Sequence, residues 1–359
     1  MKIHLLFLLL IFSNGICCIN SLVELEKRGD GLLLTTLYGT ITITEPVLIE
    51  CIEHHTFERL KKIRQYGVMC HARGNEPEYT RWQHSLGVFF ITRKYGASLE
   101  EQIDALEHDS SHTCFSHVGD ALFKSNYRTG KCSYQDEIHE QYLQATGVTA
   151  LLEKHGFAHA CDHTTKDTHR CFDQPLPGLC ADRIEYNLTG AYIDGLITHE
   201  ELTRVISALH YENGEWLFDN YGAAKQFGKI SLALSETRWG APWSAFIDHT
   251  TAQALRRACQ IGLITYDDIH YSTDDCVWQK LITSDDTEIV HLLLRIKNFH
   301  DYFAPCANGT IHIRGKFSGT DPLVKTESGL TRLSAIDPEY SAEFNRVKKL
   351  VTEGCWIRG

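Results

Sequence analysis

Histidine and aspartate side chains in three separate apolar segments constrain the fold more than any other feature of the chain. His84 lies in RWQHSLG, the adjacent pair His108-Asp109 lies in ALEHDSSH, and Asp182 lies in LCADRIEY. Around each of them apolar residues recur at intervals of three and four, which predicts helices. A fold that uses these side chains together must bring several helices to a common centre.

The chemistry of this set favours a metal site. Neutral imidazoles and carboxylates together suit a borderline first-row ion such as iron, manganese or zinc. The adjacent His108-Asp109 pair can reach one ion or bridge two, and His84 and Asp182 would complete the coordination sphere from other helices. Taken alone, each histidine is an ordinary residue in a chain that contains twenty. The ordered set predicts a divalent transition metal, with a second ion such as magnesium left open.

A second group of polar residues follows the His-Asp pair in HDSSHTCFSHVGD. If His117 and Asp120 lie on one helical turn, their spacing of three lets the carboxylate hold the imidazole. That contact would raise the pKa of the histidine and suit it to general acid catalysis. His112 and His139 would add hydrogen-bond donors to a phosphate oxygen, and Arg81 would offer a forked donor to phosphate. Structural roles remain the alternatives for His139 and Arg81.

Composition bounds the class of protein. The 359 residues are 43% hydrophobic and 10% aromatic, so the chain can bury a substantial core and disorder is excluded. The formal charge of −11 argues against a nucleic-acid-coating surface but leaves room for a local basic pocket. We expect a signal peptide at residues 1–18, a helical catalytic domain at 19–212, and a helical C-terminal region at 213–359 that packs on it.

The pattern predicts a mainly α fold with a short N-terminal β element. Strand-like segments occupy residues 31–44, and a helical stretch runs from about Val47 to Gly67. Residues 156–178 are loop-like. Further helices are expected at residues 81–95, 99–108, 179–192, 199–211, 244–261, 265–269 and 287–296.

The N-terminus has the pattern of a signal peptide. Lys2 supplies a positive start, and residues 5–12 form an apolar run too short to span a bilayer. A buried N-terminal helix is the alternative, but no amphipathic period supports it. We therefore expect a secreted or lumenal protein with no membrane span after the signal.

The thirteen cysteines agree with export, because an oxidising compartment would turn many of them into disulfides. Cys161 and Cys171 are expected to form one such bond. The alternative is a zinc clip that joins these two cysteines with His163 and His169.

The motifs resemble the HD phosphohydrolase superfamily, and within it the branch of the deoxynucleoside triphosphate triphosphohydrolases and the SAM-and-HD-domain protein. FERLKKIRQYG, RWQHSLGV, HDSSHTCFSHVGD and ADRIEY are similar, in the same order, to that branch's F-Q-R-L-x-x-I-x-Q-x-G, R-F-E-H-S-L-G-V, H-D-x-x-H-x-x-F-S-H-x-x-D and D-x-x-x-Y. The resemblance covers residues 38–209. It implies an HD-domain helical bundle with a helical C-terminal extension.

The resemblance also implies roles for individual residues. The implied metal ligands are His84, His108, Asp109 and Asp182. His117 would protonate the leaving oxygen, and Asp120 would orient it. The implied phosphate contacts are His112, His139 and Arg81. Arg183 would provide a basic group beside Asp182, Gln65 would approach the sugar, and Tyr186 would stack against the sugar or bond to it.

The chain departs from that branch where the substrate would bind. The Asp that the triphosphohydrolases use to hold a sugar hydroxyl is replaced by Gly190, and the Leu after the sugar-contacting Gln is replaced by Tyr66. Ser110-Ser111 replaces an aliphatic-Gly pair. A deoxynucleotide substrate therefore does not follow from the resemblance. Trp239 and Trp243 are expected in the core or at an interface rather than in a ligand site.

Metal-dependent hydrolysis of a phosphate ester or anhydride is the leading hypothesis. The partner would be a small phosphorylated substrate, in particular a nucleotide. The most specific version of this hypothesis is a (d)NTP triphosphohydrolase. A di-iron HD oxygenase is the second hypothesis, with His112 as a further metal ligand. A catalytically silent nucleotide-binding or interaction protein with the HD fold is the third. Related enzymes assemble through helical surfaces, so a homo-oligomer also stays open.

Overall fold

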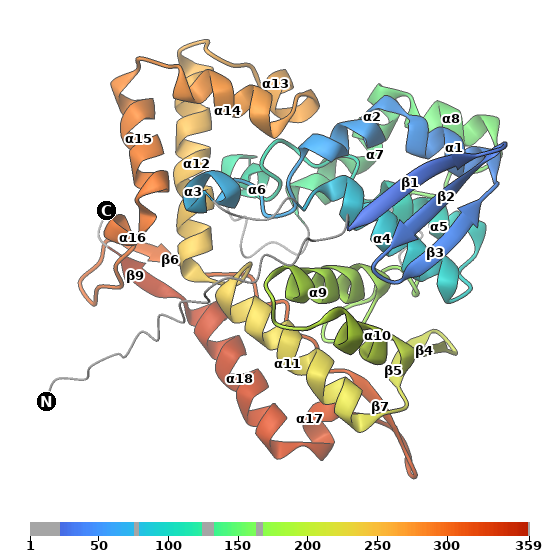
Figure 1. Cartoon of the computed structure of the whole chain (residues 1–359). Coiled ribbons are helices and arrows are strands. Elements are labelled where there is room, and N and C mark those ends of the chain that lie inside the picture. The colour runs from blue at the N-terminus through green and yellow to red at the C-terminus, as the bar shows by residue number, and fades with distance from the viewer. Residues whose placement is uncertain (1–21, 75–78, 124–132, 163–167, 358–359) are drawn as a thin grey trace, which may run out of the picture.

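The computed structural model describes residues 22–74, 79–123, 133–162 and 168–357. The expected signal peptide at residues 1–18 lies outside the described residues. The described chain is mainly α-helical with three small sheets, which confirms the expected fold class (Figure 1). None of its helices is both long and apolar enough to cross a membrane.

An antiparallel meander forms the predicted N-terminal β element and has one strand more than expected. Strands β1 (Val23–Arg28), β2 (Gly31–Thr36) and β3 (Gly39–Ile43) pair in chain order. The Tyr38 ring, in the turn before β3, lies 6.4 Å from the Phe90 ring of α4. The meander therefore packs on the helix that carries the first predicted metal ligand.

The helices and turns that follow the meander carry the predicted site residues. The expected long helix after Val47 is instead divided into short pieces, because the chain is extended at His54 and at Ile63. The elements of this part are α1 (Pro46–Glu53), α2 (His55–Arg59), η1 (Leu60–Lys62), α3 (Met69–Arg73), α4 (Arg81–Lys94), α5 (Leu99–Glu107), α6 (Val118–Phe123), α7 (Tyr134–Thr146), α8 (Val148–Lys154), α9 (Ala181–Ile193) and α10 (His199–Ser207).

Local capping fixes where the site-bearing helices begin. Thr80 and Gln83 form a capping box at α4, so Arg81 and His84 fall in its first turns. Ser98 caps α5, which ends at His108. Ser133 and its own capping box start α7, which carries His139.

The C-terminal part mixes helices with short strands. The helix expected to reach Tyr211 ends at Ser207, because the chain then enters strand β4 and pairs with β5. The expected boundary at residues 212–213 lies in the turn of that hairpin. The elements are β4 (Leu209–Glu212), β5 (Glu215–Phe218), α11 (Tyr221–Thr237), α12 (Pro242–Gln260), α13 (Tyr266–Tyr271), α14 (Asp274–Ile282), α15 (Thr287–Lys297), α16 (Phe299–Tyr302), β6 (Ile311–Ile313), β7 (Leu323–Thr326), β8 (Gly329–Arg332), α17 (Leu333–Ile336), α18 (Pro338–Glu353) and β9 (Cys355–Ile357).

One continuous apolar core joins the two parts. Helix α9 packs against α4 on one side and α11 on the other, and α11 packs in turn on α18 (Figure 1). Strand β5 pairs in parallel with β7, which ties the hairpin to the end of the chain. Residues from both parts can therefore line one site.

The cysteines correct one expectation. All ten cysteines in the described part of the chain carry free thiols, Cys161 and Cys171 included. Both side chains are buried in the core, where a cysteine packs as a small apolar residue. Their expected disulfide is absent. His163, which the alternative zinc clip needs, lies outside the described residues, and His169 instead bonds Asp104 through Nδ1 at 2.7 Å.

Candidate metal centre

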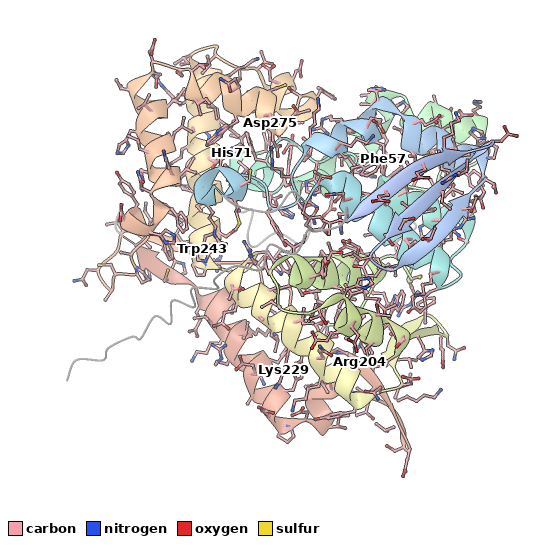
Figure 2. The ribbon with its side chains drawn as sticks, viewed as in Figure 1. Phe57, His71, Arg204, Lys229, Trp243 and Asp275 are labelled. Carbon is pink, nitrogen blue, oxygen red and sulfur yellow. The ribbon has the colours of Figure 1, made fainter. Side chains whose placement is uncertain are left out.

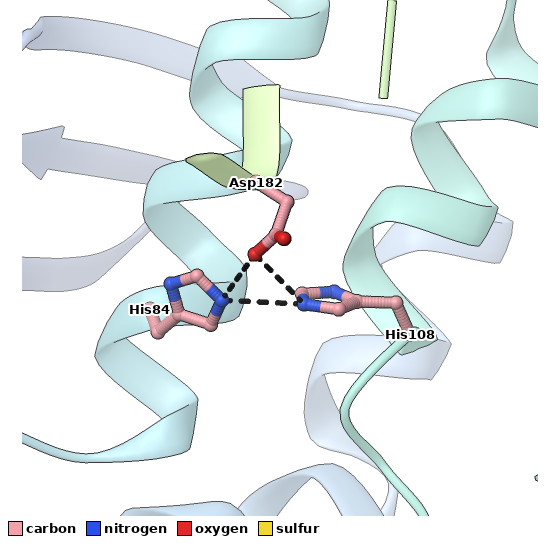
Figure 3. A group of neighbouring side chains, drawn as sticks. All are labelled: His84, His108 and Asp182. Atoms are coloured by element: carbon pink, nitrogen blue, oxygen red, sulfur yellow. Dashed lines mark hydrogen bonds and ion pairs between the residues drawn. The ribbon is translucent and has the colours of Figure 1, made fainter. Parts of the chain in front are cut away.

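Two histidines and an aspartate from three helices meet at one point (Figure 3). His84 comes from α4, His108 ends α5, and Asp182 lies in the first turn of α9. The Nε2 atom of His84 lies 3.1 Å from Asp182 Oδ1 and 3.3 Å from His108 Nε2. The three potential ligand atoms all lie within 4.8 Å of one another, a spacing that fits one shared ion.

The far side of each imidazole is already bonded, so both rings present Nε2 to the centre. His84 donates from Nδ1 to Glu185 Oε2 at 2.5 Å, and His108 donates from Nδ1 to the Ala105 carbonyl at 2.9 Å. Metal-binding histidines in proteins are oriented in this way. The donor set and its orientation therefore fit a divalent metal.

The neighbouring carboxylates change the pKa of His84. Burial opposes a charge on this imidazole, but Glu185 and Asp182 raise the pKa of His84 to about 10. The metal-free ring therefore holds a proton that an incoming ion must displace.

Glu185 is a site residue that the sequence reasoning missed. Its Oε2 accepts hydrogen bonds from His84 and from the Tyr79 hydroxyl, both at 2.5 Å, while Thr189 donates to Oε1 at 2.7 Å. A Cβ on Gly87 would lie 2.6 Å from Glu185 Oε1, so a glycine on α4 leaves space for the carboxylate. The signal was present, because Glu185 follows Asp182 by three residues and shares its helical face.

Asp109 lies beside the three-residue group and is held by two neighbours. Arg81 donates from Nη1 to Asp109 Oδ2 at 2.7 Å, and His112 Nε2 lies 3.2 Å from Oδ1. The carboxylate is also 3.7 Å from His84 Nε2 and 3.5 Å from His108 Nε2. Although burial acts in the opposite direction, the positive charge of Arg81 holds the pKa of Asp109 well below its usual range.

Arg81 and His112 thus make protein contacts where the sequence predicts phosphate contacts. The guanidinium also donates from Nε to the Ser116 hydroxyl at 3.0 Å. Burial, together with the charge of Arg81, lowers the pKa of His112 to about 3. His112 is therefore a neutral imidazole that donates to Asp109.

His117 and Asp120 form the expected pair at the start of α6. His117 Nδ1 lies 3.1 Å from Asp120 Oδ2, and the His117 side chain is 54% exposed. The other Asp120 oxygen accepts the backbone N–H of Tyr134 at 2.5 Å. Burial opposes ionisation, but the hydrogen bond from His117 lowers the pKa of Asp120, so this carboxylate stays charged and fixes the ring.

The other predicted residues lie around the same space. His139 bonds through Nδ1 to the Ser111 hydroxyl at 2.8 Å. Arg183 donates to the Gly178 carbonyl at 3.1 Å and lies 3.6 Å from Asp173. The Tyr186 ring lies 6.5 Å from the His84 ring.

A single cavity of about 460 Å³ collects almost the whole predicted set. Its size is that of a small-molecule site. His84 is buried, with a side chain that is 1% exposed, and is not among the residues that line the cavity. The predicted residues that line the cavity are Gln65, Arg81, His108, Asp109, His112, His117, Asp120, His139, Asp182, Arg183 and Tyr186.

A strained turn connects this cavity to the C-terminal part. Phe115 and Ser116 have φ angles of 63° and 53°, in the left-handed region that residues other than glycine rarely adopt. The buried Asp274 of α14 accepts the backbone N–H of Phe115 at 2.7 Å and that of Arg64 at 2.9 Å. A residue outside the predicted catalytic segment therefore holds the turn that precedes His117.

Known proteins that resemble the chain agree with this centre. No family model matches the chain. The uncharacterized protein YdhJ of Bacillus subtilis is 32% identical over 320 residues, which cover 87% of this chain and 95% of YdhJ. The metal-dependent phosphohydrolase cns2 of Cordyceps militaris is 35% identical over 186 residues, which cover 52% of each protein.

Solved structures share the fold of the chain. A crystal structure of a phosphohydrolase from Bacteroides thetaiotaomicron aligns with a TM-score of 0.65 and 15% identity, over 94% of this chain and all of that one. The chain belongs to the HD superfamily of metal-dependent phosphohydrolases, in the same family as YdhJ of Bacillus subtilis.

Proposed function

We propose that the protein hydrolyses a phosphate ester or anhydride bond in a nucleotide or a related phosphorylated metabolite. One observation carries the proposal: His108 and Asp182 of the His84–His108–Asp182 group line the same cavity as the His117–Asp120 pair. The first group fits a divalent ion, and the second fits a general acid. Hydrolysis of a phosphate bond needs both.

Each side chain then has a defined task. His84, His108 and Asp182 would hold the ion, which when bound lowers the pKa of a water and draws charge from a phosphoryl oxygen. Arg81 and His112 hold the Asp109 carboxylate against the centre. Asp120 holds the His117 ring through Nδ1, so the exposed Nε2 is the atom that donates a proton to the departing oxygen.

A nucleotide is the substrate class that the cavity supports best. Its volume of about 460 Å³ accommodates a phosphate together with an organic group. Tyr186 and Gln65 line its wall and offer an aromatic ring and an amide to that group. A triphosphate substrate is the narrower form of the proposal.

A phosphate-release screen tests this function. The purified protein is incubated with nucleoside mono-, di- and triphosphates and with phosphodiesters, in separate reactions with manganese, iron, zinc or magnesium. We expect metal-dependent release from at least one nucleotide, and removal of the metal by a chelator should stop it. Iron-dependent oxygen uptake without phosphate release would favour the HD oxygenase instead.

We also propose that the protein is exported, on the pattern of its first eighteen residues. Expression of the full chain in a secreting host tests this. Export predicts a shortened N-terminus on material recovered from the medium, whereas an intact N-terminus on protein retained in the cytosol would contradict it.

A further inference from the structure

Trp239 lies in the wall of the cavity, at the junction of α11 and α12. Its ring packs edge-on against Tyr186, with centroids 5.1 Å apart and planes at 81°. The sequence predicts this residue in the core or at an interface rather than in a ligand site. It does pack against the core, yet it also faces the space where the substrate would bind.

The indole N–H of Trp239 is buried and has no acceptor among the described residues. This differs from Trp216, whose Nε1 donates to the Cys171 carbonyl at 2.9 Å as expected of a structural tryptophan. A buried donor without an acceptor is costly, and a ligand in the adjoining cavity can supply the missing acceptor. An indole can only donate, so the ligand atom must be an acceptor.

Gly190 lies beside this ring. A Cβ at Gly190 would lie 3.6 Å from Trp239 Cη2 and 3.1 Å from the Tyr66 hydroxyl oxygen. Trp239 and Tyr66 therefore occupy the space beside α9 that a larger side chain at this position would fill.

The position of the ring along α9 indicates which part of a substrate it meets. Asp182, Tyr186 and Gly190 are spaced by four, so they form one stripe along the helix. At a rise of about 1.5 Å per residue, Gly190 lies roughly 12 Å along the axis from the metal end. A phosphate at Asp182 would leave the organic part of the substrate beneath Trp239.

We propose that Trp239 is a substrate-binding residue whose indole N–H donates to an acceptor on the nucleoside part of the substrate. This inference rests on the proposed function. It assigns substrate recognition to the C-terminal part of the chain, beyond the segment that carries the HD motifs.

The test is the variant Trp239→Phe, which keeps an aromatic ring beside Tyr186 and removes the N–H. Trp243→Phe is the matched control. Trp243 (labelled in Figure 2) stacks on Phe299 with ring centroids 5.3 Å apart and is not among the residues that line the cavity. AMP, UMP and inorganic phosphate are titrated calorimetrically into each metal-loaded protein, and phosphate release is followed in parallel.

We expect Trp239→Phe to weaken binding of at least one nucleotide about tenfold, the effect of losing one buried hydrogen bond. Inorganic phosphate should bind within about twofold of wild type, since it reaches only the metal end, and Trp243→Phe should match wild type throughout. Equal nucleotide affinity in Trp239→Phe and wild type would overturn the inference. A parallel loss for inorganic phosphate, or no nucleotide binding by wild type, would also overturn it.

The experiment distinguishes failure of the proposed hydrolysis from failure of the role given to Trp239. Nucleotide binding that depends on Trp239 without any phosphate release would contradict the proposed function alone. Release with unchanged affinity in Trp239→Phe would contradict this inference alone. If Trp239→Phe does not fold, Gly190→Val provides the test. A Cβ at this position would already lie 3.6 Å from Trp239 Cη2, so the methyl groups beyond it would displace the indole. The inference then requires weaker nucleotide binding with unchanged phosphate binding.

Discussion

At the residue scale, the metal centre depends on a carboxylate that does not face it. Glu185 bonds the rear nitrogen of His84 and is itself held by Tyr79 and Thr189. Such outer hydrogen bonds fix the orientation of a ligand ring and raise its basicity. The affinity of the site is therefore set partly by residues that never touch the ion.

Glu185→Gln should lower the affinity for zinc or manganese by about 10–100-fold, because the amide is a weaker acceptor for the His84 N–H. Competition with a coloured chelator measures the affinity directly. Glu200→Gln is the control, since this side chain is 88% exposed on α10. Unchanged affinity in Glu185→Gln would contradict the role given to this residue.

Glu107 gives a prediction about pH. Burial raises the pKa of this carboxyl from 4.5 to about 7, although Ser110 donates to it at 2.5 Å. In the folded protein the group stays protonated until pH approaches 7, whereas in the unfolded chain it ionises near 4.5. The unfolded state therefore binds fewer protons across this window, and the free energy of unfolding falls as pH rises.

Glu107→Gln should remove this fall, which amounts to roughly 3 kcal/mol between pH 4.5 and 7. Urea unfolding of the metal-free wild type and variant at pH 5 and pH 8 gives, for each protein, the change in the free energy of unfolding between the two pH values. If the wild-type and variant curves lose the same stability between these pH values, Glu107 is ionised in the folded protein and the account of it is wrong.

Sequence patterns find residues more readily than they find contacts. Eleven of the twelve predicted site residues, all except His84, line one cavity, because the HD motifs carry their spacing in the sequence itself. Hydrogen-bond partners are not encoded in this way. Arg81 bonds Asp109 from 28 residues away in the sequence, a contact that only the packing of α4 against the end of α5 creates.

At the element scale, prediction succeeded where the signal is local. Thr80 and Ser98 cap α4 and α5 within one turn, so both starts could be read from the sequence. The end of α10 could not be read in this way. Leu209 leaves the helix to pair with Phe218, and that pairing depends on a strand later in the chain.

Asp274 at the start of α14 shows the same long-range dependence and can be tested. Asn can accept through only one of its two side-chain atoms, so Asp274→Asn should leave one buried N–H, of Phe115 or Arg64, facing an amide donor. We expect a loss of about 1–3 kcal/mol in stability and lower turnover at unchanged metal content. Chemical unfolding, metal analysis and phosphate release measure the three quantities.

The neighbouring Asp275 is the matched control. Its side chain (labelled in Figure 2) is exposed, and its carboxylate lies 2.8 Å from Arg64 Nη1. Asp275→Asn should cost less than about 1 kcal/mol and leave turnover intact. Equal effects of the two substitutions would contradict the buttressing role of Asp274.

At the scale of the whole molecule, the cavity belongs to both parts of the chain. The resemblance to HD proteins covers residues 38–209, yet Arg238, Trp239, Ser244, Asp248, Lys316 and Ser318 also line the cavity. No local pattern in the sequence marks these residues, because long-range packing brings them to the site. The contacts include those of α11 with α9 and of α12 with α6. The grouping of the HD-motif residues around one cavity was therefore predictable, and the C-terminal part of the cavity wall was not.

The proposed metal binding and proton donation are two separable functions of one cavity, and measuring both on the same preparations tests them most directly. Metal content and phosphate release are determined for wild type, His108→Ala and His117→Ala. We predict that His108→Ala loses both, whereas His117→Ala retains the metal and loses at least about 100-fold in release, the typical contribution of a general acid. Wild-type release by His108→Ala, or full activity in His117→Ala, would contradict the account.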